Sequence, residues 1–320
     1  MMLGQRADQD AIDEINRELG LDKSIFYQYG LYLNDLSPIS YHSTTESDAS
    51  FYEAEKYGGT KVLATDQFDI VFKAPYLRKS YQSKKKVSSI LFESLPETAV
   101  LALASILIAS VLGILLGVLS ALYKDAWVDK TLLLLATSGM ALPSFFVGII
   151  FAWLFGYVWS DWTGLNMSGS LYEVDDLGRG EYINWTNLVL PALTLGIRPL
   201  SVVLQLSRNS MLEVLSMDYV RTARAKGLTT RSTLFGHALK NALNPVVTTI
   251  SGMFASLMAG AVFVEIIFSW KGIGWEIVNA LEKYDLPIVM GAVLIIAVIF
   301  VVVNILVDIL YGVLDPRVRV

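Results

Sequence analysis

Five long apolar stretches set the strongest limit on how this 320-residue chain can fold. They cover residues 97–122, 131–158, 187–207, 245–268 and 288–314. Each approaches or exceeds the roughly 20 residues that a helix needs to cross a bilayer. Hydropathy within them is continuous rather than alternating, which argues against a transmembrane β-barrel. Charged residues are only 17% of the chain, against about 25% in soluble domains. The sequence therefore predicts an all-α polytopic membrane protein with five spans.

Small residues and prolines within these stretches bear on how the helices pack. Gly113 and Gly117 suit close helix packing in the first stretch. Pro143 lies inside the second stretch, and Pro191 and Pro199 lie inside the third. Prolines are tolerated at membrane depth where neighbouring helices satisfy the carbonyls that they free.

A polar segment, Arg208 to Asn244, separates the third and fourth stretches. Its six basic residues are Arg208, Arg221, Arg224, Lys226, Arg231 and Lys240, and only Glu213 and Asp218 oppose them. The segment is too long for a tight turn, and Gly227 divides it into two short helical halves. This composition favours a segment that a cytoplasmic partner grips, although a positive loop with no further role has the same composition.

Local signals define the two halves of this segment. Asp218 is placed to cap or stabilise the N-terminus of the first helix, and basic residues lie toward its C-terminal end. Gly227 can adopt the left-handed conformation that reverses the chain, and Leu228 can cover the helix end. Thr230 is the expected cap of a second helix over residues 231–243.

Basic residues in the short loops predict the orientation. With the polar segment inside, residues 123–130 and the C-terminal Arg317 and Arg319 are also inside, giving ten basic residues. The opposite loops, 159–186 and 269–287, carry three, or eight when the five basic residues just before the first span are counted. We therefore expect a cytoplasmic C-terminus and an N-terminal region outside the cell membrane.

Residues 1–86 are polar and acidic, with an amphipathic helix expected at Asp8–Leu19. Residues 37–74 have the composition of a solvated loop or small lobe. Translocating this region without a signal peptide or a preceding span would be uncommon, so we expect a further helix upstream of Met1.

Catalysis has no candidate residues in this sequence. There is no cysteine, and the two histidines, His42 and His237, lie far apart, so neither a thiolate nor a multi-histidine metal site is expected. The sequence has no phosphate-binding loop for a nucleotide. We expect no metal and no cofactor bound by this chain, and no enzyme activity of its own.

Residues 218–228 and 237–245 resemble the cytoplasmic coupling loop of binding-protein-dependent ABC importer permeases, above all the dipeptide/oligopeptide (and nickel) branch. Residues 221–223, Arg-Thr-Ala, stand where the family has Glu-Ala-Ala, and Gly227 is kept. Residues 237–240, His-Ala-Leu-Lys, stand at its Ile-x-Leu-Pro positions, a form that the peptide branch tolerates. Further similar segments are 140–145, 190–196, 260–274, 284–287 and 304–317.

The resemblance implies a type I importer permease (MetI-like) fold, with the family's first span missing from the five spans present here. It implies a periplasmic region at residues 1–86 with an insertion at about 37–74, and a permease domain at 87–320 with its coupling loop at 208–244. It further implies a multi-pass protein of the bacterial inner membrane, surrounded by lipid and without nucleic acid.

The implied partners are a homologous second permease subunit, two cytoplasmic ATP-binding subunits that use the ATP, and an extracytoplasmic substrate-binding protein. The residues expected to contact the ATPases are Asp218, Tyr219, Arg221, Thr222, Ala223, Arg224, Lys226, Gly227 and Leu228. Arg198 and Glu265 are candidates for the translocation path, because ionisable groups at membrane depth are costly and often functional. A structural pairing is the competing interpretation of Arg198.

The implied function is import of di- and oligopeptides. Import of nickel or another small solute by the same architecture stays open at this stage. An ATP-independent channel or secondary transporter, and a sensory or scaffold protein that uses the N-terminal region, are the alternatives from other classes. Whether the permease pair is homodimeric or heterodimeric is also open.

Overall fold

The computed structural model describes residues 22–45, 48–175, 178 and 180–314. The chain forms two compact units, one from Met1–Phe92 with Ala280–Gly291 and the other from Glu93–Asn279 with Ala292–Val320. The helix expected at Asp8–Leu19 and the basic residues Arg317 and Arg319 lie outside the described residues.

Apolar helices dominate the structure, as the sequence predicts. Three are long and apolar enough to cross a membrane: α4 (Val87–Leu122), α8 (Thr186–Leu215) and α15 (Leu286–Leu314). Two bent pairs add to them: α5 (Trp127–Ala141) with α6 (Ser144–Trp153) and the π-helical turn η1 (Leu154–Val158), and α12 (Asn244–Gly260) with α13 (Val262–Phe268). The described residues thus hold three spans, or five if each bent pair is one span.

The second expected stretch is divided at Pro143, where α5 and α6 meet at 109°. Leu142, the last residue before this proline, has an extended backbone with ψ of 135°, and Pro143 is extended in the same way. A residue that precedes proline is disfavoured in the helical region, which accounts for the break. By contrast, Pro191 and Pro199 both lie inside the continuous helix α8.

Small residues bring α4 and α5 against α8. A Cβ atom added to Gly113 would lie 2.8 Å from the Val203 Cβ, and one added to Gly117 would lie 2.5 Å from the Leu204 carbonyl oxygen. These distances are too short for any side chain, so the expectation of close packing at both glycines is confirmed.

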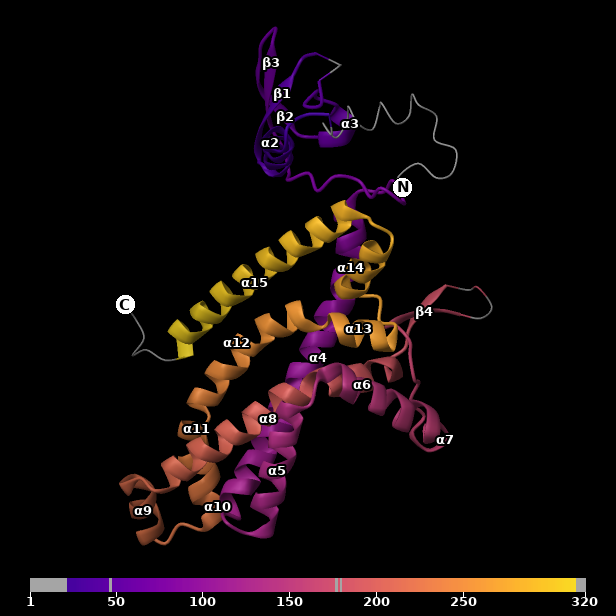
Figure 1. Cartoon of the computed structure of the whole chain (residues 1–320). Helices are drawn as coiled ribbons and strands as arrows, with labels where there is room; N and C mark the ends of the chain where they lie inside the picture. The colour runs from indigo at the N-terminus through magenta and orange to yellow at the C-terminus, as the bar shows by residue number, and fades with distance from the viewer. Residues whose placement is uncertain (1–21, 46–47, 176–177, 179, 315–320) are drawn as a thin grey trace. The chain divides into compact units, whose positions relative to one another are not determined.

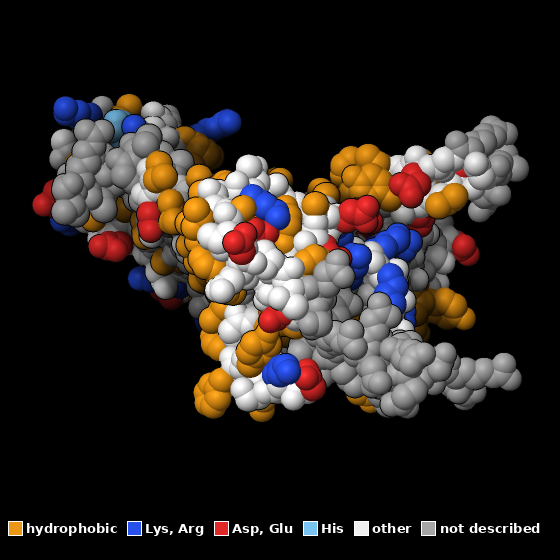
Figure 2. Space-filling model, turned by 90° about the horizontal axis from the view of Figure 1, so that it is seen from above, with side chains coloured by type: hydrophobic (Ala, Val, Ile, Leu, Met, Phe, Trp, Pro, Cys, Tyr) orange, Lys and Arg blue, Asp and Glu red, His pale blue; other side chains and the backbone are white. Residues whose placement is uncertain are grey.

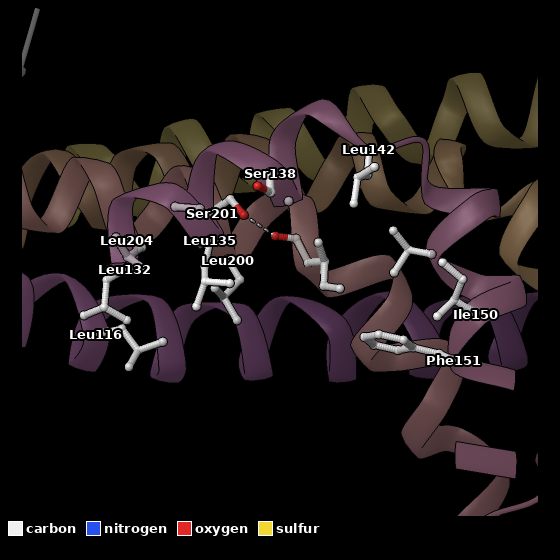
Figure 3. A pocket seen from close by; sticks show the side chains of 14 residues that line it. Leu116, Leu132, Leu135, Ser138, Leu142, Ile150, Phe151, Leu200, Ser201 and Leu204 are labelled. Atoms are coloured by element: carbon white, nitrogen blue, oxygen red, sulfur yellow. Dashed lines mark hydrogen bonds between the residues drawn. The ribbon is translucent and has the colours of Figure 1, made fainter. Parts of the chain in front are cut away.

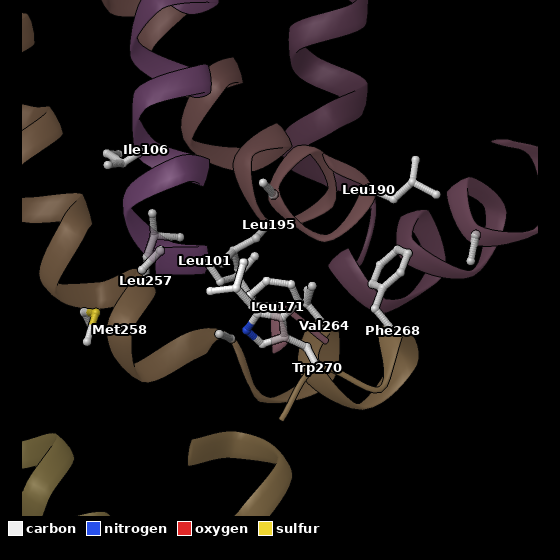
Figure 4. Close-up of a cluster of buried hydrophobic side chains, with 14 residues drawn as sticks. Leu101, Ile106, Leu171, Leu190, Leu195, Leu257, Met258, Val264, Phe268 and Trp270 are labelled. Carbon is white, nitrogen blue, oxygen red and sulfur yellow. The ribbon is translucent and has the colours of Figure 1, made fainter. Parts of the chain in front are cut away.

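A buried cluster in this unit joins α4, α8, α12 and the turn after α13 (Figure 4). Leu101, Leu190 and Trp270 are at most 1% exposed. The Trp270 indole donates a hydrogen bond of 2.9 Å to the Glu97 carbonyl oxygen, so its one polar atom is satisfied. Elsewhere large apolar side chains stay exposed along the helices, as expected for surfaces that face lipid or protein, and Figure 2 shows such side chains on one face.

The first unit contains a small α+β lobe where the sequence predicts a solvated loop or small lobe. Its elements are α2 (Ile25–Leu36), β1 (Ile39–Ser43), α3 (Ala54–Tyr57), β2 (Thr60–Ala64) and β3 (Phe68–Phe72). The strands form an antiparallel sheet in the order β1-β3-β2. Between α6 and α8 of the other unit lie α7 (Ser160–Thr163) and the hairpin β4–β5 (Tyr172–Val174 and Glu181–Ile183).

Polar and aromatic side chains fill the interior of the lobe. His42 is fully buried, and its Nδ1 and Nε2 atoms lie 3.0 Å from the Ser50 carbonyl oxygen and 2.8 Å from the Ser40 Oγ. Arg78 Nε donates to Asp35 Oδ2 at 2.8 Å. Burial lowers the pKa of His42, because the imidazolium form would lose its hydration.

Candidate functional site: the segment between α8 and α12

The candidate site begins later than the sequence indicates, because α8 continues through Arg208 to Leu215. The segment that follows consists of α9 (Asp218–Ala225), α10 (Thr230–Thr233), the π-helical turn η2 (Leu234–Ala238) and α11 (Leu239–Ala242). We call residues 216–243 the α9–α11 module. Figure 1 shows it at one end of its unit, where α11 leads into α12.

Helix α9 has one buried and one exposed face. Val220 and Ala223 are buried, whereas Arg221 and Arg224 are exposed. Asp218 lies in the first turn without capping it, since the N-cap is Met217, which has no side-chain hydrogen bond. The Asp218 carboxylate instead lies 3.6 Å from Arg221 Nη1 in a solvent-exposed pair, and such pairs contribute little to stability.

Gly227 ends α9 as expected, with φ of 82° in the left-handed region. The Gly227 N–H donates to the Arg224 carbonyl at 3.0 Å, and the Leu228 N–H donates to the Ala223 carbonyl at 3.3 Å. This pair of bonds is the Schellman arrangement, which satisfies carbonyls that the helix end leaves free. A Cβ atom added to Gly227 would meet nothing within 4 Å, so only backbone conformation requires glycine here.

The second half begins with a different cap from the expected Thr230. Thr229 Oγ1 accepts a hydrogen bond from the Ser232 N–H at 3.3 Å, and the Thr229 carbonyl accepts one from the Thr233 N–H at 2.9 Å. The expected helix over residues 231–243 is also not uniform, because it widens into η2 before continuing as α11. Thr229 and Thr230 are chemically equivalent caps, so the sequence does not distinguish them.

An apolar cluster holds the module against the ends of α4 and α8. Its buried members are Ala121, Met211, Val214, Val220, Leu234, Ala238 and Ala242. Asn241 adds a hydrogen bond of 2.8 Å from its Nδ2 to the Tyr219 hydroxyl, which joins α11 to α9. Movement of α9 therefore cannot occur without displacing or repacking the end of α8.

The outer face of the module combines basic and apolar groups. All of the residues expected to form the contact are exposed except Ala223, which packs inward. Tyr219 and Leu228 are 39% and 38% exposed, and Phe235 is 60% exposed. Sequence reasoning omits Phe235, although an aromatic residue in a polar helical segment is a signal that could have drawn attention to it. This mixture of basic, aromatic and aliphatic groups suits a protein partner.

The two candidates for the translocation path occupy different environments. Arg198 is exposed on α8. Glu265 is fully buried: its Oε1 accepts from the Thr98 hydroxyl at 2.8 Å and its Oε2 from the Trp275 N–H at 3.0 Å. Glu265 thereby ties the start of α14 (Ile273–Glu282) to α4. Among the described residues no hydrogen bond or ion pair joins Arg198 to Glu265.

An apolar cavity of about 420 Å³ lies beside the break between α5 and α6 (Figure 3). Leu116, Leu135, Phe151 and Leu200 are among the residues that line it, from α4, α5, α6 and α8. The Ser201 hydroxyl in its wall donates to the Ile197 carbonyl at 2.9 Å. The lining carries no charged side chain, so it offers nothing to hold a charged solute.

Comparison with known proteins places the chain in a family. Residues 113–320 match the family described as binding-protein-dependent transport system inner membrane component. The dipeptide transport system permease protein DppB of Haemophilus influenzae is 40% identical over 256 residues, which are 75% of this chain and 76% of that protein. The di/tripeptide transport system permease protein DppB of Pseudomonas aeruginosa is 33% identical over 333 residues, covering 100% of this chain and 88% of that protein.

A solved structure confirms the fold. Inward-facing MetNI methionine ABC transporter matches with a TM-score of 0.56 at 14% identity, over 71% of this chain and 97% of that one. The expected type I importer permease (MetI-like) fold is therefore present. The family match over residues 113–320 and the two relatives show that the chain belongs to the family of binding-protein-dependent transport system inner membrane components.

Proposed function

We propose that this chain is a membrane-spanning permease subunit of an ATP-driven importer that carries di- and oligopeptides. The observation that carries the proposal is the α9–α11 module, an exposed basic and apolar surface anchored on the end of a membrane helix. The relatives support the substrate class, since those from H. influenzae and P. aeruginosa are named as dipeptide and di/tripeptide permeases. Those names do not favour nickel.

The energy for transport comes from two cytoplasmic ATP-binding subunits in this proposal. The sequence has no phosphate-binding loop of its own, so the work of hydrolysis has to arrive through protein contact. Exposed Arg221, Arg224 and Lys226 give the module charge for that contact, and Tyr219 and Leu228 give it apolar area. An extracytoplasmic binding protein delivers the peptide, and a homologous permease completes the pathway.

Transport then follows from a two-state change of the permease pair that nucleotide binding biases. A shift of the ATPase subunits moves α9, and the apolar cluster under α9 passes the displacement to α8 and α4. This arrangement requires the module to face the cytoplasm, as the distribution of basic residues predicts. The C-terminus is then cytoplasmic, residues 1–86 are periplasmic with the insertion at 37–74, and residues 87–320 form the permease domain.

Within the pathway, Arg198 is the better candidate for contact with a peptide carboxylate. Its side chain is exposed on α8, whereas both carboxylate oxygens of Glu265 are already hydrogen-bonded inside the protein. Burying a charge at membrane depth is costly, so an exposed arginine there fits a polar path better than a lipid surface.

The test is reconstitution of the chain with its partner permease, both ATPases and the binding protein in liposomes. Dipeptide should accumulate inside only when ATP is supplied on the side of the α9–α11 module. Accumulation without ATP would overturn the proposal in favour of a channel or secondary transporter. Uptake of nickel instead of peptide would overturn the substrate class.

A further inference from the structure

A buried carboxylate, Asp129, lies in the first turn of α5 and receives four hydrogen bonds. Arg208 Nε and Nη2 donate to its two oxygens, each at 2.7 Å. The Ser120 hydroxyl and the Asp125 N–H, the latter at 2.9 Å, complete the set. Asp129 is 2% exposed. Every acceptor position is thus used, and the arginine binds in the bidentate geometry that fixes orientation as well as distance.

These four donors come from three separate elements. Ser120 belongs to the last turn of α4, Asp125 to the turn between α4 and α5, and Arg208 to α8. Asp125 itself has φ of 64°, an uncommon conformation for a residue with a side chain. The carboxylate therefore ties the turn between α4 and α5 to α8, 79 residues away in the chain.

The same stretch of α8 supports the α9–α11 module. Met211 and Val214, within two turns of Arg208, belong to the buried cluster beneath α9 and η2. Ala121, directly after Ser120, belongs to that cluster as well. The ion pair and the apolar cluster beneath the module thus lie at the same ends of α4 and α8.

Beyond the ion pair, α5 also packs closely against α8. A Cβ atom added to Gly139 would lie 2.5 Å from the Ser201 Oγ on α8, so the backbone of α5 packs directly against α8 at this point. Gly113 and Gly117 hold α4 to α8 in the same way. The regular helix of α5 ends at Ala141, and the chain turns by 109° into α6. The three helices form a block whose far limit is the break at Leu142 and Pro143.

We propose that the Asp129–Arg208 pair is a positioning clamp, which makes α4, α5 and α8 move as one body when the α9–α11 module is displaced. The inference rests on the proposed function as an ATP-driven permease. Asp129 and Arg208 touch neither substrate nor ATPase in this proposal; they determine how completely movement of the module reaches the break at Pro143. A buried pair is not needed for stability as such, because apolar residues of similar size often replace one without loss.

The experiment compares transport with ATP hydrolysis in the reconstituted complex. Asp129→Asn keeps the shape but removes the charge, and Arg208→Lys keeps the charge but removes the bidentate geometry. Lys130→Gln, a change at an exposed neighbour on α5, is the matched control. We expect both clamp variants to lower the peptide transported per ATP hydrolysed by roughly 2- to 30-fold, the range that mutations in coupling networks cause, and the control to leave it unchanged.

A second measurement separates positioning from simple loss of folding. The chain has no native cysteine, so spin labels can be placed at Leu134→Cys on α5 and Ser232→Cys in the module, both exposed positions. With the clamp intact, the distance between labels should stay the same with and without ATP. In Arg208→Lys it should differ between the two states.

The outcomes distinguish the clamp from the proposed function. If the unmodified complex takes up no peptide with ATP, the proposed function fails and the clamp is not at issue. If it transports peptide and the clamp variants keep the normal ratio of peptide to ATP, or the label distance stays constant in them, the clamp is refuted. Should Asp129→Asn fail to assemble, Arg208→Lys and the charge exchange of Asp129→Arg with Arg208→Asp decide the matter, the exchange restoring part of the ratio.

Discussion

Replacing Gly227 should separate ATP hydrolysis from transport while leaving the protein in the membrane. The residue has φ of 82°, and a Cβ atom there would meet nothing within 4 Å. The cost of Gly227→Val is therefore the strain of a left-handed backbone, about 1–2 kcal/mol or more for a β-branched residue. An energy of this size lowers the equilibrium constant for forming the native turn by roughly 5- to 30-fold. In the molecules that leave the native turn, the two hydrogen bonds that close α9 would be lost.

The assay is peptide uptake and ATP hydrolysis by the reconstituted complex, with membrane insertion followed by immunoblot. Gly227→Val should insert normally and hydrolyse ATP, but its peptide uptake should fall, by at most the factor by which the equilibrium constant of the turn changes. Gly227→Asn should lose less, because asparagine tolerates the left-handed region. Gly236→Ala is the matched control, since Gly236 lies in the same module without a positive φ and with open space around it. Normal uptake by Gly227→Val would refute the reasoning.

Three further changes test other parts of the structure. Glu265→Leu leaves the Thr98 hydroxyl and the Trp275 N–H without their acceptor. We expect a loss of about 1–3 kcal/mol for each group, seen as a lower Tm in detergent, with Glu265→Gln recovering part of it because an amide keeps one acceptor oxygen; an unchanged Tm for the leucine variant would contradict the buried contact. Phe235→Ala should weaken ATPase binding by roughly tenfold if this 60% exposed ring is an interface anchor, as a titration of the ATPase subunits would measure, and equal affinity would remove it from the interface. Burial lowers the pKa of His42 in the folded lobe, so the unfolded chain binds its proton first as the pH falls below about 6.5. The lobe should therefore lose stability between pH 7 and pH 5, roughly, observed as faster proteolysis there, and His42→Gln should flatten this dependence.

Much of the architecture could be read from the sequence because its signals are local. A long apolar run specifies a helix by composition alone, and each of the five runs lies on the helices of the structure. Gly227 ends α9 where expected, because a glycine after a basic helical turn satisfies a local backbone requirement. The small residues that pack α4 against α8 were also recognisable, since small residues in a spanning helix favour the close approach of another helix.

Features that depend on distant partners could not be predicted. Arg208 counts as one more basic residue of a loop in the sequence, yet it belongs to α8 and binds a carboxylate 79 residues earlier in the chain. The residues next to Glu265 in the sequence do not indicate that its carboxylate accepts a hydrogen bond from the Thr98 hydroxyl on α4. A helix breaks at Pro143, but Pro191 and Pro199 lie inside α8, which continues through both of them. Whether a proline breaks its helix therefore depends on packing against other helices, which the sequence does not show.

The strands of the N-terminal lobe were missed for a different reason. All five residues of β2, Thr60–Ala64, are exposed, so it shows no alternation between buried and exposed positions. In β3 the buried positions alternate, but one of them is Asp69, whose carboxylate pairs with Lys61 at 2.5 Å. Hydropathy therefore gives no period-two pattern to identify this sheet.

The break at Pro143 has a consequence for the surrounding bilayer. Helix α5 has 15 residues, which at 1.5 Å per residue gives a length of roughly 22 Å. The hydrocarbon layer is about 30 Å thick, and α6 leaves α5 at 109° and adds no length along its axis. Beside α5 the lipid has to thin, or the protein has to shield the end of the helix, and each option costs a fraction of a kcal/mol for every ångström of mismatch. The energy of this mismatch therefore depends on the acyl-chain length of the membrane lipids, and it arises where α5 ends at Pro143.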